Sequence, residues 1–206
     1  MSKRIINYFA LILVFVLFAF KANAQLNETF NGITYGVPYG WDNVDYDNLN
    51  MSAWSYYANG FDGAAVACQA MDVSSKTYAV LKTPTLRNLP AGCQLTFQAQ
   101  APSQISQMTV YLVYGAKQIN LGNVRTKGGW SEFSYDLSAY AGYSISVWFR
   151  IDCGGKGSYA SEWCILDNVK VAGKPNCAQP VDLSVVSLGQ TEVSLMWSMG
   201  KDGTIS

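Results

Sequence analysis

Two carboxylates lie among apolar residues in segments whose pattern is typical of β-strands. In a strand, successive side chains alternate between faces, so Asp167 shares a side with Ile165 and Val169, and Glu28 shares a side with Leu26. An ionised carboxylate is not buried without compensation, so each should be paired, bound to a metal, or placed at a wet rim. Because these residues lie on the first and last predicted strands of one domain, we expect a closed β-sandwich whose ends are tied by a cation.

The composition argues against catalysis. The chain contains no histidine, which removes the commonest general base and every Ser-His-Asp or Cys-His arrangement. A glycosidase of this fold class would need two carboxylates about 5–10 Å apart across a sugar site. The four glutamates form no alternating acidic pattern that would aim several carboxylates from one strand. We therefore expect a protein that is not an enzyme.

The N-terminal pattern predicts a secretory signal peptide over residues 1–24. Lys3 and Arg4 precede an apolar run over residues 5–20, and small residues around Ala22 supply a cleavage pattern. The alternative is a retained membrane anchor, but the run is shorter than the roughly 20 residues that a spanning helix needs. No later segment is apolar enough to span. We expect a secreted or cell-surface protein without a transmembrane segment after cleavage.

The charge of the mature chain excludes one class of partner. Three of the 14 basic residues, Lys3, Arg4 and Lys21, lie in the leader, which leaves 11 against 14 acidic residues and a net charge of about −3. A nucleic-acid-binding domain carries a basic surface. We expect no nucleic-acid partner.

Short alternating runs separated by Gly, Pro, Asn and Asp clusters predict an all-β fold. The clearest run is 93–100, where apolar residues alternate with polar ones to give one buried and one solvated face. With the two terminal strands, the further runs bring the total to about eight antiparallel strands, the number of a jelly-roll β-sandwich. These runs cover residues 64–71, 78–83, 108–114, 130–137 and 144–151.

A long irregular segment, residues 35–61, is rich in aromatic residues. Such a loop is longer than compact domains usually contain without a function. Aromatic rings on loops can stack on sugar rings, which makes Tyr46, Tyr56 and Tyr57 candidate ligand-binding residues. The alternative is that the rings cover the core, the favoured interpretation for Trp41 and Trp54.

Trp148 and Arg150 alternate onto the outward side of a predicted strand whose inward residues are all apolar. We expect them beside polar faces such as that of Gln94, Gln98 and Gln100, on a surface that a sheet-face ligand would use. Coverage by a loop or by a partner domain would explain the pair equally well.

Five cysteines in an exported chain suggest disulfides with one cysteine left over. Cys153 and Cys164 flank a Gly-rich loop, so they could bridge two strands of a hairpin. Cys68 with Cys93 is the weaker alternative, because both fall on predicted core faces where a free thiol also packs well. Cysteine spacing and the lack of histidine argue against a zinc site.

Several short motifs, taken in order, resemble the cleaved-adhesin jelly rolls, which are related to MAM-like domains and occur in surface proteins of Bacteroidetes. The resemblance covers residues 26–172, so we place this domain at 25–172. The motifs are Glu28-Thr29-Phe30, Pro38-Tyr39-Gly40-Trp41, Trp54, Gly63, Leu81-Lys82-Thr83-Pro84, Leu95-Thr96-Phe97 and Leu166-Asp167-Asn168-Val169.

The resemblance implies a structural calcium ion. In that family and in similar carbohydrate-binding modules, an early Glu and a late Asp contribute to the site. Carried over, these are Glu28 and Asp167, with Asp62 as a third ligand. Asn168 occupies a position where a second Asp is common.

The end of the chain has a different character. Residues 173–179 read as a linker, and residues 180–206 resemble the opening of a fibronectin type III domain. That module needs about 100 residues to close its sandwich. We therefore expect an incomplete second β-sandwich.

These features together predict a non-catalytic adhesion or carbohydrate-binding module of an exported multidomain protein, with a glycan or a host or extracellular protein as its partner. The alternative is a structural spacer or accessory domain beside a catalytic domain, a protease or glycoside hydrolase, that this chain does not contain.

Overall fold

The computed structural model describes residues 25–45, 53–173, 180–188 and 193–199. The predicted signal peptide and Tyr46 lie outside these ranges. The chain divides into two compact units, Met1–Gly173 and Lys174–Ser206. We call the first the sandwich unit. Within the described ranges, no helix has the length and hydropathy needed to cross a membrane.

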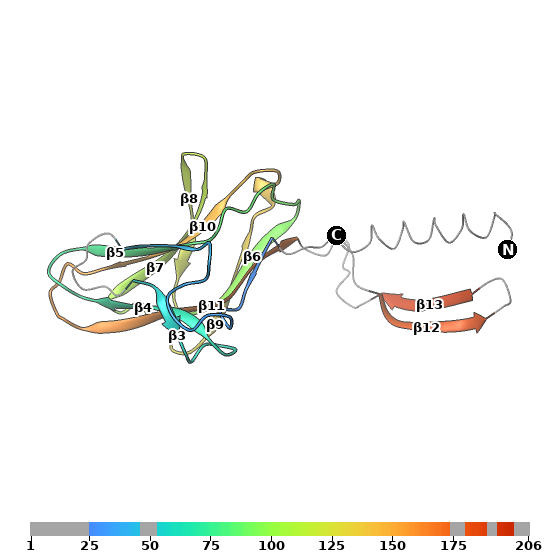
Figure 1. The fold of residues 1–206 in the computed structure, drawn as a ribbon, viewed down its shortest axis with the longest axis horizontal. Helices are drawn as coiled ribbons and strands as arrows, with labels where there is room; N and C mark the ends of the chain where they lie inside the picture. The colour runs from blue at the N-terminus through green and yellow to red at the C-terminus, as the bar shows by residue number, and fades with distance from the viewer. Residues whose placement is uncertain (1–24, 46–52, 174–179, 189–192, 200–206) are drawn as a thin grey trace. The chain divides into compact units, whose positions relative to one another are not determined.

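A six-stranded antiparallel sheet forms one layer of the sandwich unit, in the order β3-β4-β11-β6-β9 (Figure 1). The first strand, β1, pairs with the second half of β11, and β4 pairs with its first half. The first and last strands of the unit are therefore neighbours. The strands are β1 (Leu26–Glu28), β3 (Ser55–Tyr57), β4 (Ala65–Met71), β6 (Cys93–Gln100), β9 (Ser131–Asp136) and β11 (Ser161–Gly173).

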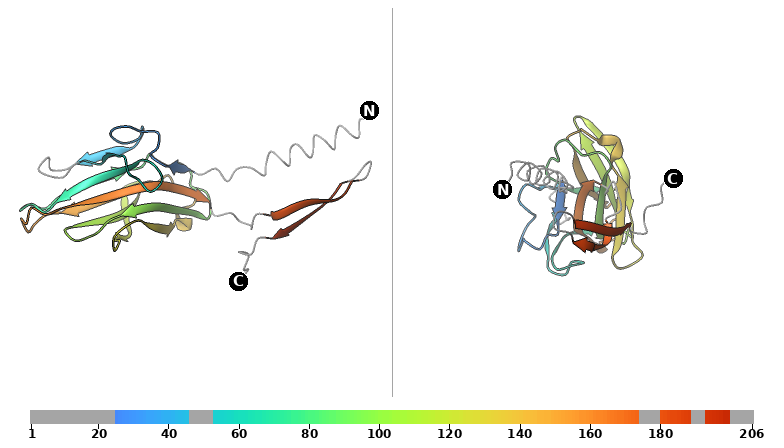
Figure 2. Two further views of the ribbon diagram at one scale, coloured as in Figure 1. Left: turned by 90° about the horizontal axis from the view of Figure 1, so that it is seen from below. Right: turned by 90° about the vertical axis from the view of Figure 1, so that its right-hand side faces the viewer.

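A five-stranded antiparallel sheet forms the other layer, in the order β2-β5-β10-β7-β8, and lies face to face with the first (Figure 2). Its middle strand, β10, pairs with β5 on one side and β7 on the other. The strands are β2 (Asp42–Asp45), β5 (Thr77–Lys82), β7 (Ser106–Tyr114), β8 (Lys117–Val124) and β10 (Ser146–Cys153).

Alternation along the strands builds the core between the two sheets. In β6, every second residue from Cys93 to Ala99 is buried, and the glutamines and threonine between them are partly exposed. The core includes a ring cluster in which Phe97 of one sheet meets Phe149 of the other edge-on, with centroids 5.1 Å apart. Trp54 is fully buried and Trp41 nearly so, which confirms that these two rings belong to the core. The predicted all-β sandwich is confirmed.

The sandwich unit has more strands than the sequence predicted. The segment 35–61, predicted as irregular, contains two short edge strands, β2 and β3. The prediction also omitted β8, whose sequence mixes polar residues with Gly122 and shows no clear alternation. Edge strands bury little surface, so a hydrophobic pattern marks them poorly.

The second unit contains β12 (Pro180–Leu188) and β13 (Val193–Met199), which pair antiparallel as a two-stranded sheet. Two strands were predicted in this region. Its assignment to a fibronectin type III domain stays a prediction.

Candidate functional site

The outward face of the five-stranded sheet carries aromatic and charged side chains in register. Trp148 of β10 lies between Lys82 of β5 and Tyr111 of β7. Two residues further along β10, Arg150 lies between Val80 and Thr109. We call this surface the β10 face. It is a sheet face, so the strands fix the spacing of its side chains more rigidly than a loop would.

Lys82 contacts both Trp148 and Asp42 at one end of the β10 face. Its ammonium lies 4.7 Å from the centre of the Trp148 ring and 2.9 Å from a carboxylate oxygen of Asp42 on the edge strand β2. A cation over an aromatic face is attracted by the ring quadrupole. The indole of Trp148 is therefore fixed in place while part of its surface remains accessible.

Arg150 and Asp152 form a second fixed group on the same strand. The guanidinium donates from Nε and Nη2 to the carboxylate of Asp152, at 2.5–3.0 Å, and lies 3.9 Å from the ring centre of Tyr78. The hydrogen bonds to Asp152 raise the pKa of Arg150, against the opposing effect of burial. The group therefore presents a charged guanidinium, a carboxylate and a phenol together.

Amide side chains from β8 extend the face at its other edge. Asn120 lies opposite Tyr111, and Asn123 lies opposite Thr109, whose hydroxyl donates to the Asn123 carboxamide oxygen at 3.0 Å. Both asparagines are exposed. The β10 face thus combines aromatic rings with donors and acceptors of hydrogen bonds.

The structure corrects the predicted surroundings of Trp148 and Arg150. Their outward orientation is as predicted, but Gln94, Gln98 and Gln100 belong to β6 in the other sheet and lie on the opposite side of the unit. Alternation shows which side of its own sheet a residue occupies. It does not show which strands are neighbours.

The predicted aromatic ligand-binding residues are not brought together with the β10 face. Tyr57 lies on the outward side of the six-stranded sheet, where it packs on Ala65, Ala67 and Ile165 and against the ring of Trp163 at 5.9 Å. Tyr56, its neighbour on β3, alternates onto the other side of that strand. Their role in binding stays a prediction, as does that of Tyr46.

Asp167 is fully buried, although not on the side of the sheet that the sequence predicted. A β-bulge lies between Asp167 and Lys170, and Asn168 has a positive φ of 50°. The extra residue puts Val169 on the core side and leaves Asp167 on the outward side with Ile165. The prediction that Asp167 shares a side with Val169 is therefore wrong.

Main-chain amides surround the Asp167 carboxylate. Oδ2 accepts hydrogen bonds from the amides of Phe61 at 2.8 Å and Asp62 at 3.2 Å, and Oδ1 accepts one from Asn168 at 2.6 Å. Burial raises the pKa of Asp167, and the three hydrogen bonds oppose that effect. A Cβ atom at Gly60 would lie 2.7 Å from Oδ2, so a glycine is needed for the close approach.

The three predicted calcium ligands are only partly brought together. Asp62 is close enough to Asp167 to raise its pKa, but Glu28 lies on the core side of β1 with Leu26, where its carboxylate accepts the amide of Phe30 at 2.7 Å. Among the described residues, no three His, Cys, Asp or Glu side chains are grouped so that they could hold a metal ion. Calcium binding stays a prediction.

The predicted hairpin between Cys153 and Cys164 is wrong, because β10 and β11 belong to different sheets. Both cysteines are buried free thiols, so the predicted bridge is not formed in this structure. Cys93, considered as a partner of Cys68, is also a free thiol. Burial raises the pKa of Cys153 to about 11 and that of Cys164 to about 12.

Solved structures with a similar fold include two cleaved adhesin domains. The chain is similar to the K3 cleaved adhesin domain of Lys-gingipain from Porphyromonas gingivalis, at 20% identity over 73% of this chain and 98% of that domain, with a TM-score of 0.55. The K1 domain of the same protein gives 20% identity over the same shares, with a TM-score of 0.52. The sandwich unit therefore has the fold of the cleaved adhesin domains, as the resemblance implied.

A structure described as carbohydrate-binding modules of the β-sandwich superfamily is also similar, at 14% identity over 72% of this chain and 61% of that one, with a TM-score of 0.51. No protein-family model matches the sequence, and no curated protein matches it.

Proposed function

We propose that the sandwich unit is an adhesion or carbohydrate-binding module of an extracellular protein and that it binds glycan through the β10 face. The observation that carries this proposal is the fixed array on β10, in which Trp148 is held by Lys82 and lies two residues from the Arg150–Asp152 pair. The fold it shares with adhesin and carbohydrate-binding domains supports the same role.

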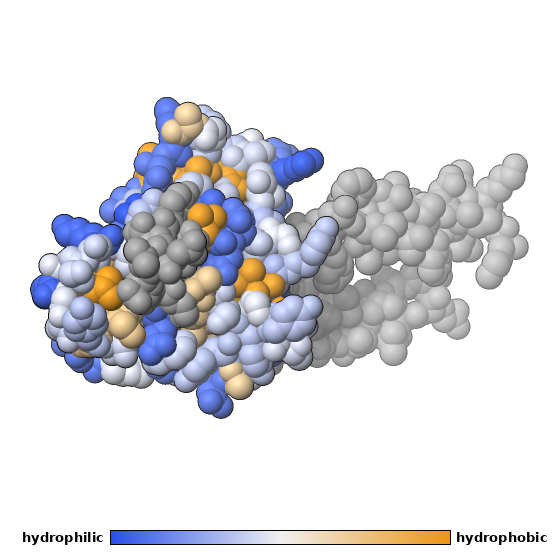
Figure 3. All heavy atoms as spheres, turned by 60° about the vertical axis from the view of Figure 1, so that its left-hand side comes forward, coloured by the Kyte–Doolittle hydropathy of each residue, from blue (hydrophilic) through white to orange (hydrophobic). Residues whose placement is uncertain are grey.

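The chemistry of the β10 face suits a ligand rich in hydroxyl groups. A sugar ring presents apolar C–H faces and a rim of hydroxyls. The rings of Trp148, Tyr78 and Tyr111 can pack against the C–H faces of the sugar. Arg150 and Asp152 supply hydrogen-bond donors and acceptors for its hydroxyl groups. Figure 3 shows, on the side it presents, separate hydrophobic patches within a largely hydrophilic surface.

The fixed cations also favour a second candidate function, that of a structural spacer. Lys82 and Arg150 each lie over an aromatic ring and so cover part of the surface that a sugar would use. A spacer needs no free ring faces. The two functions differ in one outcome, because only the first predicts binding by the folded unit.

A glycan array tests the proposal. The wild-type chain should bind at least one class of glycan, and Trp148→Ala should lose that signal while retaining a β-type circular dichroism spectrum and a cooperative unfolding transition. Absence of binding by the folded wild type would favour the spacer.

A further inference from the structure

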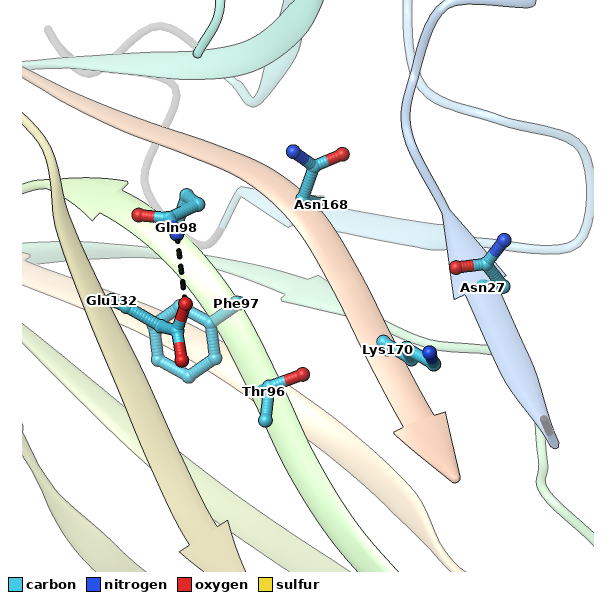
Figure 4. A pocket seen from close by; sticks show the side chains of 7 residues that line it. All are labelled: Asn27, Thr96, Phe97, Gln98, Glu132, Asn168 and Lys170. Carbon is cyan, nitrogen blue, oxygen red and sulfur yellow. Dashed lines mark hydrogen bonds between the residues drawn. The ribbon is translucent and has the colours of Figure 1, made fainter. Parts of the chain in front are cut away.

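A groove on the outward side of the six-stranded sheet lies on the opposite side of the unit from the β10 face. Its volume is about 280 Å³, near the lower limit for small-molecule sites and suited to a single ring. β1, β11, β6 and β9 all contribute to it (Figure 4). We call it the β6 groove.

The side chains of the β6 groove are almost all polar. It combines three carboxamides, one hydroxyl, one carboxylate and one ammonium, while Phe97 belongs to the core and contributes its strand to the wall. One negative and one positive group balance in charge, so the groove favours a neutral ligand with many donors and acceptors. The polar residues are Asn27, Thr96, Gln98, Glu132, Asn168 and Lys170.

The backbone fixes these groups in place. Gln98 lies opposite Glu132 in register and donates to its carboxylate at 3.2 Å, which orients both side chains. Asn27 lies opposite Lys170 across β1 and β11. The β-bulge between Asp167 and Lys170 includes Asn168, which has a left-handed conformation and lines the groove.

An aromatic pair lies on the same side of the six-stranded sheet as the polar groups. Trp130 directly precedes β9, two residues before Glu132, and the half-exposed ring of Phe61 meets it edge-on at 5.8 Å. Phe61 is kept there because its amide donates to Asp167, which lies opposite Gln98. Trp130 packs on Ala65, Ala67 and Ile165, so the pair is an apolar surface on the same side of the sheet, and neither ring lines the groove.

From this arrangement we infer that the β6 groove is a second carbohydrate site, which takes one neutral sugar ring through its carboxamides. The inference rests on the proposed function only for its class of ligand, since its residues and its side of the unit are different. A module with one site on each side would contact two glycan chains, or two segments of one chain, at once.

Nuclear magnetic resonance tests this inference directly, because the side-chain NH₂ groups of Asn27, Gln98 and Asn168 give their own signals. The ¹⁵N-labelled full chain is titrated separately with glucose, galactose, mannose and N-acetylglucosamine at millimolar concentrations. The variants are Gln98→Ala and Glu132→Gln in the groove and Trp148→Ala on the β10 face. The matched control is Gln94→Ala, on the same strand and side as Gln98 but outside the groove.

At least one sugar should shift the Asn27 and Gln98 side-chain signals in the wild type. The Asn27 shift should persist in Trp148→Ala and Gln94→Ala and fall at least several-fold in Gln98→Ala and Glu132→Gln. Lack of any shift in the groove, or loss of the shift in Trp148→Ala, would overturn the inference. Shifts confined to the groove would support it and count against the β10 face as the site of the proposed function.

Discussion

The main-chain amide of Phe61 donates to Oδ2 of Asp167 across 106 residues of sequence, at 2.8 Å. The contact joins the loop before β4 to the last strand of the sandwich unit. It also keeps Phe61, whose ring meets that of Trp130, on the outward side of the six-stranded sheet. One buried carboxylate therefore accepts hydrogen bonds from both the loop and the bulge residue Asn168.

Replacement of this carboxylate should be strongly destabilising. Asp167→Ala would leave the amides of Phe61, Asp62 and Asn168 without their acceptor, and we expect a loss on the order of 3 kcal/mol in the free energy of unfolding. Chemical denaturation measures it. Asp62→Ala is the control, because it removes an exposed side chain and keeps the main-chain amide, and it should change stability by less than about 0.5 kcal/mol. Equal effects of the two substitutions would contradict this role.

Asp72 should make the unit sensitive to acid. Its carboxylate accepts from the Ser158 hydroxyl at 2.5 Å and from the amides of Ser158 and Lys156 at 3.1 Å each. The hydrogen bond from Ser158 contributes most to lowering the pKa of Asp72 below its ordinary value, although burial opposes it. A lowered pKa stabilises the fold above the unfolded-state value of about 3.9, and that contribution is lost as the pH falls through the folded-state pKa.

Denaturation between pH 7 and pH 2 measures this contribution. Stability of the wild type should fall more steeply below about pH 4 than that of Asp72→Asn, which cannot ionise there. Identical slopes in the two proteins would show that Asp72 does not anchor the 154–160 loop through its charge.

Calcium should raise the thermal midpoint if the site implied by the resemblance exists. A ligand that binds only the native state stabilises it by mass action. We expect a higher midpoint in millimolar calcium than in chelator for the wild type and for Glu28→Gln, because Glu28 lies on the core side of the sheet and Asp167 on its outward side. Asp167→Asn should show no difference. A thermal midpoint that is the same in calcium and in chelator would contradict the predicted calcium site.

The thiols of Cys153 and Cys164 should resist alkylation in the folded protein. Both are buried, and their raised pKa values keep them protonated at pH 8. Peptide mass mapping after iodoacetamide treatment should find them unmodified in the native state and modified in denaturant without reductant. If modification in denaturant required prior reduction, the bridge predicted from sequence would be present after all.

The alternation of apolar and polar residues predicted the strands that are buried on one face only. The run 93–100 appears in the structure as β6 with the predicted faces, and Trp148 points outward as expected. The bulge at Asn168 could not be predicted from this pattern, because no glycine marks its left-handed conformation. As a result, the sequence assigned Asp167 to the wrong side.

Contacts between distant strands were the other missing information. The pattern of residues 146–153 shows that Arg150 points outward, but not that β5 brings Tyr78 to it. The β6 groove was missed for the same reason, since its polar residues come from four strands. Its one visible signal was the polar face of residues 94–100.

The affinity of Trp148→Ala for a glycan that the wild type binds tests the central claim most directly. Isothermal titration calorimetry should show a loss of at least tenfold in affinity, about 1.4 kcal/mol, because a fixed aromatic ring on the middle strand of a binding face contributes much of the binding energy. Trp163→Ala, the same change on the other sheet, should bind within twofold of the wild type. Wild-type affinity in Trp148→Ala would contradict the assignment of glycan binding to the β10 face.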